Sequence, residues 1–282
     1  MKLAVNYSEA LLSLIQADPS LPVDCIKVPT EPFPGSWRQF ERGKRFRPLL
    51  PHLAQAGIIT LGHPDPALRF HEPSVLRALR ESSTDYLSTH LEAKVDYFPD
   101  LAAYQHQLEP AVEMRLREHY RQAIREVRQR LPVPLVIENY PYYKWGWHYR
   151  LASEPWFIAE LCASEQCGFL LDIAHARCTA WSMGIALADL LAALPLERVR
   201  EIHLAGTWQR KEGIIDTHTV LEKADYQLFR DLLRKTNPEV VSIEYGGMPD
   251  RIQNMQGDVI PISRNDPEAL HGMIERITKI IR

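Results

Sequence analysis

The sequence of 282 residues predicts an α/β fold, a closed (β/α)8 TIM barrel that forms a single domain over residues 1–282. Eight short apolar segments recur along the chain, and amphipathic helical segments lie between several of them. Several apolar segments are continuous rather than alternating, which is typical of strands covered on both faces. A doubly wound open sheet is the alternative. No GxGxxG follows the first strand and no GxxxxGK[ST] occurs, which disfavours its nucleotide-binding versions.

The first four predicted strands are LAVNYS (3–8), VDCIKV (23–28), FRPLLPHL (46–53) and TDYLSTHL (84–91). Region 29–80 is the least regular part of the chain. Its proline-rich pieces, PTEPFPGS (29–36) and GHPDP (62–66), predict long loops over one face of the barrel. The long segment 109–131 follows, charged on one side and apolar on the other, which predicts a helix.

The last four predicted strands are PLVIENY (134–140), GFLLDIAHA (168–176), VREIHLAG (199–206) and VVSIEYG (240–246). Helices are predicted over 153–164, 182–194, 223–235 and 266–282. Ser153 and Asp266 lie at N-cap positions, because a proline follows each of them in the first turn.

The composition excludes some classes of partner. A net charge of −3 and a pI near 6.4 give no broad basic surface for nucleic acid. No apolar run is long enough to cross a membrane, and the N-terminus lacks the pattern of a signal peptide, so we expect a cytoplasmic protein. The four cysteines form no CxxC pair, and we interpret them as buried reduced thiols.

Metal-ligating residue types follow the apolar runs at the ends of the predicted strands. They are His52, His90, Glu138, Asp172, His175, His203 and Glu244, joined by Asp216 and His218 in the loop after the seventh strand. In a barrel, the carboxyl ends of the strands converge on one face, where active sites are built. So many acids at one place would repel each other unless cations neutralised them. The mixture of imidazole and carboxylate suits Fe, Mn, Zn or Co, and the number of candidates predicts two or three ions.

Several short motifs resemble a known family. They are Ser88–Leu91 (STHL), Glu138-Asn139, Leu170–Asp172 (LLD), Glu201–Gly206 (EIHLAG), Asp216–His218 (DTH) and Glu244. Together they resemble the multinuclear non-heme iron-dependent oxidative enzymes, a former domain of unknown function that includes the methanobactin-biosynthesis oxidase. The resemblance runs from about Asp24 to Glu244 and implies a xylose-isomerase-like barrel. In place of two asparagines after LLD-x, this chain has Ala174 and His175, which groups it with members in which that histidine helps to bind metal.

The resemblance implies an oxidase that holds two or three iron ions in mixed Fe(II)/Fe(III) states and uses O2 as co-substrate. Its substrate would be a residue of a ribosomally synthesised peptide, a cysteine or a C-terminal residue, and a separately encoded peptide-recognition protein is an expected partner. The nine candidates named above would bind metal, and Glu138, His175 and Asp216 would be catalytic. Asn139, Tyr140 and Thr217 would orient ligands, and Arg177 would touch substrate. The aromatic loop 144–149 would either touch substrate or form a packed lid over the barrel. Lys27 stands where many members have an acid, and we expect it to affect the substrate channel rather than to bind metal.

Two alternatives remain open at this stage. A sugar isomerase or a phosphodiesterase that cuts DNA at abasic sites would use a similar cluster of His, Asp and Glu with divalent metal on the same barrel. The chain could also be a metal- or peptide-binding component without chemistry of its own. The intact set of candidate ligands argues against the second alternative.

Overall fold

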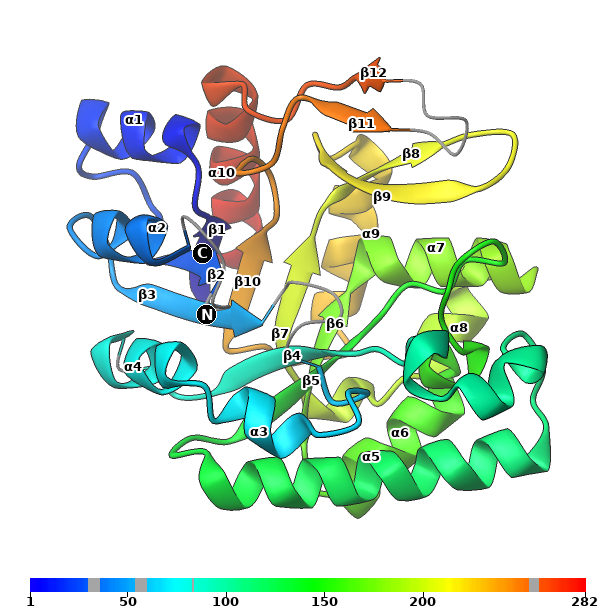
Figure 1. Ribbon diagram of the computed structural model, residues 1–282. Helices are drawn as coiled ribbons and strands as arrows, with labels where there is room; N and C mark the ends of the chain where they lie inside the picture. Colours follow the sequence, from blue (N-terminus) through cyan, green and yellow to red (C-terminus); the bar gives the residue numbers. More distant parts are fainter. Residues whose placement is uncertain (30–35, 54–59, 83, 254–258) are drawn as a thin grey trace.

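The computed structural model describes residues 1–29, 36–53, 60–82, 84–253 and 259–282. Eight parallel strands form a closed barrel in the order β1-β10-β7-β6-β5-β4-β3-β2, which confirms the predicted (β/α)8 TIM-barrel fold (Figure 1). The barrel strands are β1 (Lys2–Asn6), β2 (Cys25–Pro29), β3 (Leu49–Leu53), β4 (Leu87–Leu91), β5 (Leu135–Asn139), β6 (Gly168–Asp172), β7 (Val199–Leu204) and β10 (Val240–Ile243).

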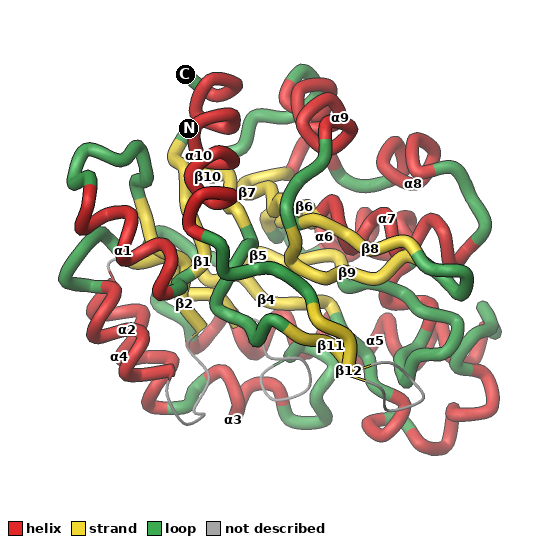
Figure 2. The backbone as a smooth tube through the Cα atoms, turned by 90° about the horizontal axis from the view of Figure 1, so that it is seen from above, coloured by secondary structure: helices red, strands yellow, loops and turns green. Residues whose placement is uncertain are grey.

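Helices surround the barrel, as the view from above shows (Figure 2). They are α1 (Glu9–Ala17), α2 (Ser36–Gly43), α3 (Pro66–Phe70), α4 (Pro73–Ser82), α5 (Pro110–Arg130), α6 (Pro155–Ser164), α7 (Ile173–Met183), α8 (Leu187–Ala193), α9 (Lys223–Leu233) and α10 (Pro267–Ile281). Their apolar sides pack on the outer faces of the strands in one large core. No described helix is both long and apolar enough to cross a membrane.

The barrel interior is built in two layers, because alternate residues of a strand point to the same side. The lower layer is mostly apolar and contains Ala4, Cys25, Leu50, Tyr86, Val136, Leu170 and Val240. For each of these seven residues the residue two positions further along is polar, and these polar residues are Asn6, Lys27, His52, Ser88, Glu138, Asp172 and Ser242. The upper layer therefore gathers polar side chains toward the carboxyl ends of the strands.

Two hairpins extend from the carboxyl ends of the strands. The first pairs β8 (Gly206–Gln209) with β9 (Ile214–Thr219), and the second pairs β11 (Arg251–Gln253) with β12 (Val259–Pro261). The prediction of one strand over 199–206 is therefore wrong at its end, since β7 stops at Leu204 and Gly206 starts the first hairpin. A side chain at Gly206 would collide with the backbone of β9, because its Cβ would lie 2.6 Å from the carbonyl oxygen of Thr219.

Other predicted boundaries are also wrong. The strand predicted over 168–176 ends at Asp172, and α7 begins at the next residue. The single helix predicted over 182–194 is two helices, α7 and α8, separated at Gly184, whose φ of 71° is left-handed. The described residues of region 29–80 contain the helices α2, α3 and most of α4 as well as loops, while residues 30–35 and 54–59 lie outside the described part.

The two N-cap predictions have different outcomes. Asp266 caps α10 as predicted, since its carboxylate accepts from the backbone N–H groups of Glu268 and Ala269. Ser153 does not cap α6, because Glu154 holds that position. The hydroxyl of Ser153 instead donates to the carbonyl oxygen of Tyr140 at 3.0 Å.

Candidate metal centre

The structure brings all nine candidate ligands together at the carboxyl end of the barrel. His52, His90, Glu138, Asp172 and His203 lie on strands β3, β4, β5, β6 and β7, and Glu244 directly follows β10. Strand register places them side by side, with His90 opposite Glu138 and Asp172 opposite His203. His175 comes from the first turn of α7, and Asp216 and His218 come from β9 of the first hairpin.

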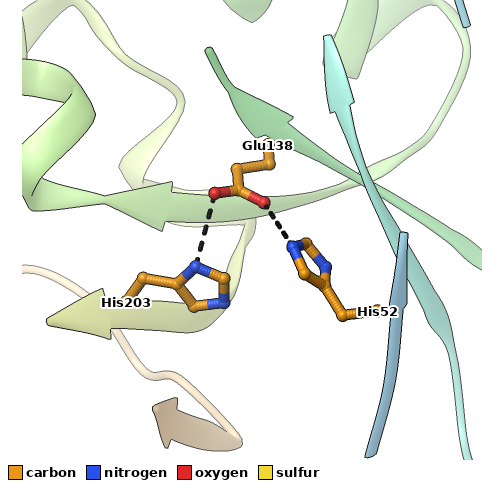
Figure 3. A group of neighbouring side chains, drawn as sticks. All are labelled: His52, Glu138 and His203. Carbon is orange, nitrogen blue, oxygen red and sulfur yellow. Dashed lines mark ion pairs between the residues drawn. The ribbon is translucent and has the colours of Figure 1, made fainter. Parts of the chain in front are cut away.

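Glu138 lies at the centre of this cluster. Its Oε2 is 3.4 Å from Nε2 of His52 and 3.5 Å from Nε2 of His90. Its Oε1 is 3.3 Å from Nδ1 of His203 and 3.4 Å from Nδ1 of His175. Figure 3 shows the carboxylate between the imidazoles of His52 and His203. Both oxygens are buried and neither accepts a hydrogen bond.

His203 connects Glu138 to a second group of acids. Its Nδ1 lies 3.5 Å from Oδ2 of Asp172 and 3.2 Å from Oε1 of Glu244. The three residues offer ligand atoms that all lie within 4.8 Å of one another. The same spacing holds for two groups that share Glu138, namely His52 with His203 and His90 with His175.

Asp216 brings the hairpin into the cluster. Its Oδ2 is 3.1 Å from Nε2 of His218 and 3.4 Å from Nε2 of His175. Nε2 of His218 also lies 3.6 Å from Oε2 of Glu244, so Glu244 faces His203 with one oxygen and His218 with the other. The backbone of His218 is left-handed, with φ of 52°. Such strain in a non-glycine residue costs about 1 kcal/mol or more and is found most often at functional sites.

Hydrogen bonds fix which ring nitrogen faces the cluster in two of the histidines, His52 and His175. Nδ1 of His52 is bonded to Oγ of Ser88 at 2.7 Å, so its Nε2 faces Glu138. Nδ1 of His175 donates to the carbonyl oxygen of Asn139 at 2.8 Å, which leaves its Nε2 toward Asp216. Such outer contacts set the tautomer and the orientation of metal-binding histidines.

Asp172 and His175 occupy a junction between strand and helix. Asp172 is the N-cap of α7, and its Oδ1 accepts from the backbone N–H of His175 at 2.6 Å. The side-chain amide of Asn139 makes two hydrogen bonds to the backbone N–H and carbonyl oxygen of Asp172, each 2.9 Å long. One oxygen of Asp172 thus caps the helix, while Oδ2 stays buried without a hydrogen bond and faces His203.

The cluster fits metal ions better than it fits an empty polar core. Within the cluster, the buried atoms without hydrogen-bond partners are Oε1 and Oε2 of Glu138, Oδ2 of Asp172, and Nδ1 of both His203 and His218. Leaving such groups unpaired is costly. Two ligand atoms that each lie about 2.1 Å from one ion are roughly 3.0–3.4 Å apart at octahedral or tetrahedral angles. Five contacts around Glu138 and His203, at 3.2 to 3.5 Å, lie within or close to this range.

Without metal, protonated imidazoles balance part of the negative charge of the carboxylates. Burial lowers the pKa of His175, but Asp172, Asp216 and Glu138 outweigh it and raise the pKa to about 10. Burial also opposes the charge on His218, yet Asp216 raises its pKa to about 9. His52 behaves differently, because burial and the nearby Lys27 hold its pKa well below the ordinary range. Metal cations would take the place of these protons.

A cavity of about 520 Å³ opens onto the cluster. His52, His90, His175, Asp216, His218 and Glu244 lie on its wall, as do the apolar or aromatic residues Tyr7, Val28, Pro29, Tyr140, Pro141, Tyr143 and Met248. The ring of Tyr140 lies against two candidate ligands, with centroids 5.1 Å from His90 and 6.0 Å from His175. The hydroxyl of Tyr143 accepts from the backbone N–H of Asp216 at 3.3 Å, which ties the cavity wall to the hairpin.

Two residues that were predicted to touch substrate or to orient ligands, Arg177 and Thr217, make other contacts. Arg177 does not line this cavity, because its guanidinium pairs with Asp225 of α9 at 2.6 Å. Thr217 contacts no ligand through its hydroxyl, which donates to the carbonyl oxygen of Gly206 and thereby holds the hairpin. In the aromatic loop, Trp145 packs against Trp181 and Tyr143, whereas Trp147 is 76% exposed.

Sequence reasoning missed the residues behind the ligands. Ser88 and Glu201 each lie two positions before a candidate histidine on the same strand, His90 and His203. Glu201 contacts Nε2 of His203 at 3.1 Å, and Ser88 contacts His52 of the adjacent strand. Period-two alternation along the strand was the signal that could have found them, since it places both residues inside the barrel.

Comparison with known proteins gives a family match over almost the whole chain. The family model described as "RiPP precursor modification enzyme MbnB/TglH/ChrH" matches residues 10–279. A UPF0276 protein of Acaryochloris marina is 30% identical over 192 residues, which are 66% of this chain and 67% of that protein. A UPF0276 protein of Paraburkholderia phytofirmans is 31% identical over 134 residues, which are 45% of this chain and only 43% of the relative.

Solved structures with similar folds are distant in sequence. A putative xylose isomerase from Rhodospirillum rubrum has a TM-score of 0.58 and 12% identity, with 99% of each chain covered. Endonuclease IV from Thermus thermophilus has a TM-score of 0.56 and 15% identity, covering 99% of this chain and 100% of that one. At these identities the likeness shows a xylose-isomerase-like barrel and nothing more about function.

Proposed function

The chain belongs to the MbnB/TglH/ChrH family of RiPP precursor modification enzymes, and from that premise we propose that it is a multinuclear iron-dependent oxidase that uses O2 to modify a peptide residue. The reacting residue in this proposal is a cysteine or a C-terminal residue of a ribosomally made precursor. The observation that carries the proposal is the buried cluster of five histidines and four carboxylates around Glu138, with several ligand atoms left unpaired.

The donor set supports iron over the hard cations. Calcium and magnesium prefer oxygen ligands alone, whereas mixed imidazole and carboxylate suits iron and its first-row neighbours. Glu138 and Glu244 each face imidazoles with both oxygens, which is the arrangement that bridging carboxylates need. The positive charge of two or three ions would balance the negative charge of the four carboxylates.

The chain's own residues hold and enclose the reacting centre. When bound, iron in mixed Fe(II)/Fe(III) states would supply the redox chemistry by which O2 oxidises the peptide. Ser88, Asn139 and Asp172 fix the ligand side chains and the first turn of α7 before any ion arrives. The cavity of about 520 Å³ has room for a short peptide segment, and Tyr140 and Tyr143 lie on its wall beside the cluster.

The reaction test uses protein reconstituted with Fe(II) in air and supplied with cysteine-containing precursor peptides. The proposal predicts two or three iron ions per chain, a visible absorption band, O2 consumption and a peptide of changed mass. The matched variants are Glu138→Gln and Glu165→Gln, since Glu165 is also buried but pairs with Arg125 away from the cluster. Only Glu138→Gln should abolish oxidation.

The same test separates the proposal from the hydrolase and isomerase alternatives. Stoichiometric zinc in a colourless protein, together with cleavage of DNA at abasic sites, would support a phosphodiesterase and reject the oxidase. Isomerisation of a sugar with divalent metal would do the same for the isomerase. Tight iron binding without O2 consumption for any of the peptides would reduce the protein to a binding component.

A separately encoded recognition protein is the partner proposed for peptide capture. Co-purification with the products of neighbouring genes tests this idea directly. Full oxidation of the peptide by the purified chain alone would reject it.

A further inference from the structure

Glu201 lies one layer below the candidate ligands and belongs to none of the predicted roles. It stands opposite Leu170 and Val240 in the strand register, so an acid occupies a layer that is otherwise mainly apolar. Its carboxylate is fully buried. It accepts hydrogen bonds from Nζ of Lys27 at 2.6 Å, Oγ of Ser242 at 2.5 Å, the hydroxyl of Tyr86 at 2.8 Å and Nε2 of His203 at 3.1 Å.

Lys27 brings a positive charge to the same place. It lies on β2, is 2% exposed, and its ammonium group contacts both Glu201 and Nε2 of His203. The other nitrogen of His203, Nδ1, faces Glu138, Asp172 and Glu244. The imidazole of His203 therefore lies between the buried Lys27–Glu201 pair and the acids Glu138, Asp172 and Glu244.

The two charges act on this imidazole in opposite directions. A carboxylate behind a metal-binding histidine orients the ring and makes it a stronger donor to the metal. Here Oε1 of Glu201 is closer to Lys27 than to His203, at 2.6 Å against 3.1 Å. Lys27 therefore draws the carboxylate away from the imidazole and adds a positive charge behind it, in a buried position where charges interact strongly.

We propose that Lys27 and Glu201 are positioning residues that set, with opposite sign, the electrostatic environment of the ion held by Asp172, His203 and Glu244. This inference rests on the metal centre of the proposed function. Glu201 holds Nδ1 of His203 toward the ion and strengthens binding. Lys27 weakens binding and favours the less positive oxidation state of the ion.

The test uses Lys27→Met, Glu201→Gln and the double variant, with Lys44→Met as an exposed control that pairs with Glu81. Cobalt(II) is the probe, titrated against a competing chelator and followed by its visible absorption. Lys27→Met should bind cobalt about tenfold more tightly and Glu201→Gln about tenfold more weakly, as is typical of changes behind a metal ligand. Lys44→Met should bind as the parent does.

The reduction potential of the iron-loaded protein gives a second readout. It should fall in Lys27→Met and rise in Glu201→Gln. If Lys27→Met does not fold, because it leaves Glu201 buried without its cation, the double variant is compared with Glu201→Gln. Loss of the lysine in that background should again tighten cobalt binding and lower the potential.

The outcomes separate this inference from the proposed function. Shifts of the same sign in both single variants, or no shift in folded protein that binds cobalt, would leave the pair a purely structural one and overturn the inference. Opposite shifts without any peptide oxidation would support the inference and reject the oxidase. A parent protein that binds no cobalt would reject the metal centre and this inference together.

Discussion

At the scale of single residues, Glu138 decides whether the cluster can hold metal. It faces four imidazoles from four different elements with its two oxygens, and no hydrogen bond satisfies either oxygen. An uncharged amide in its place could not bridge two cations, and its N–H groups would point at potential ligands. The cluster therefore depends on this carboxylate more than on any single histidine.

The corresponding prediction concerns Glu138→Gln. We expect the iron content to fall from two or three ions per chain to one or none, measured by elemental analysis after reconstitution. Glu165→Gln should keep the parent content, because its carboxylate pairs with Arg125 outside the cluster. Unchanged metal content in folded Glu138→Gln would contradict a bridging role.

The candidate ligands could be predicted residue by residue because they are charged or aromatic groups at the ends of apolar runs. All nine of those named from the sequence lie in the cluster. Alternation along the strand could place Glu201 inside the barrel, but its role could not be predicted, because that role depends on Lys27, which is 174 positions away in the chain. Arg177, predicted to touch substrate, pairs instead with Asp225 of α9, because two residues apart on a helix its side chain points to a different side from that of His175.

At the scale of elements, the junction of β6 and α7 shows why the strand prediction ran too far. The segment Ile173–Met183 is apolar on most sides because the helix is largely buried, so it carries little helical periodicity. The helix begins where Asp172 caps it, and this cap places His175 in the first turn. The two residues come together through a cap rather than through one continuous strand end.

The left-handed residues that follow two of the helices give a prediction about stability. Gly184 and Gln166 follow α7 and α6 with φ of 71° and 52°. Gly184→Ala should lower the free energy of unfolding by about 1 kcal/mol through backbone strain alone, since no atom lies near the added Cβ. Gln166→Gly should raise it by about 0.5 kcal/mol, because glycine suits this position. Chemical denaturation of the metal-free protein measures both, and equal effects of the same sign would contradict the argument.

The hairpin β8–β9 is the element that delivers Asp216 and His218, and its turn is packed against the aromatic loop. A Cβ at Gly213 would lie 2.3 Å from Cη2 of Trp145. Gly213→Ala should therefore displace the turn and reduce the metal content by one ion, while the ligands on the barrel strands keep theirs. Elemental analysis measures the loss, and adding Trp145→Ala should restore the parent content. A double variant as poor as Gly213→Ala would show that the collision is not the cause.

At the scale of the whole molecule, the barrel collects ligands that the chain separates by almost two hundred residues, from His52 to Glu244. The sequence predicted this because a (β/α)8 barrel brings the carboxyl ends of its strands to one rim. The two hairpins and the helices of region 29–80 could not be predicted, since their short segments depend on packing against the finished barrel.

The shared protonation of the cluster predicts how metal uptake depends on pH. With pKa values raised to about 10 and about 9, His175 and His218 carry protons in the metal-free protein at neutral pH. Metal must displace these protons, so its affinity should rise at least about tenfold per pH unit from neutral pH up to about 9. Chelator competition at several pH values measures the slope, with His148→Gln as a control, because His148 pairs with Glu92 outside the cluster. An affinity independent of pH would contradict this charge assignment.

The most direct test of the metal centre is a crystal structure of iron-loaded protein with anomalous scattering measured at the iron edge. The proposed metal centre predicts two or three iron peaks between Glu138, Asp172, His203 and Glu244. These peaks should extend toward His52 and His90 on one side and toward Asp216 and His218 on the other. A map with no iron in this cluster, or with iron held by other residues, would contradict it.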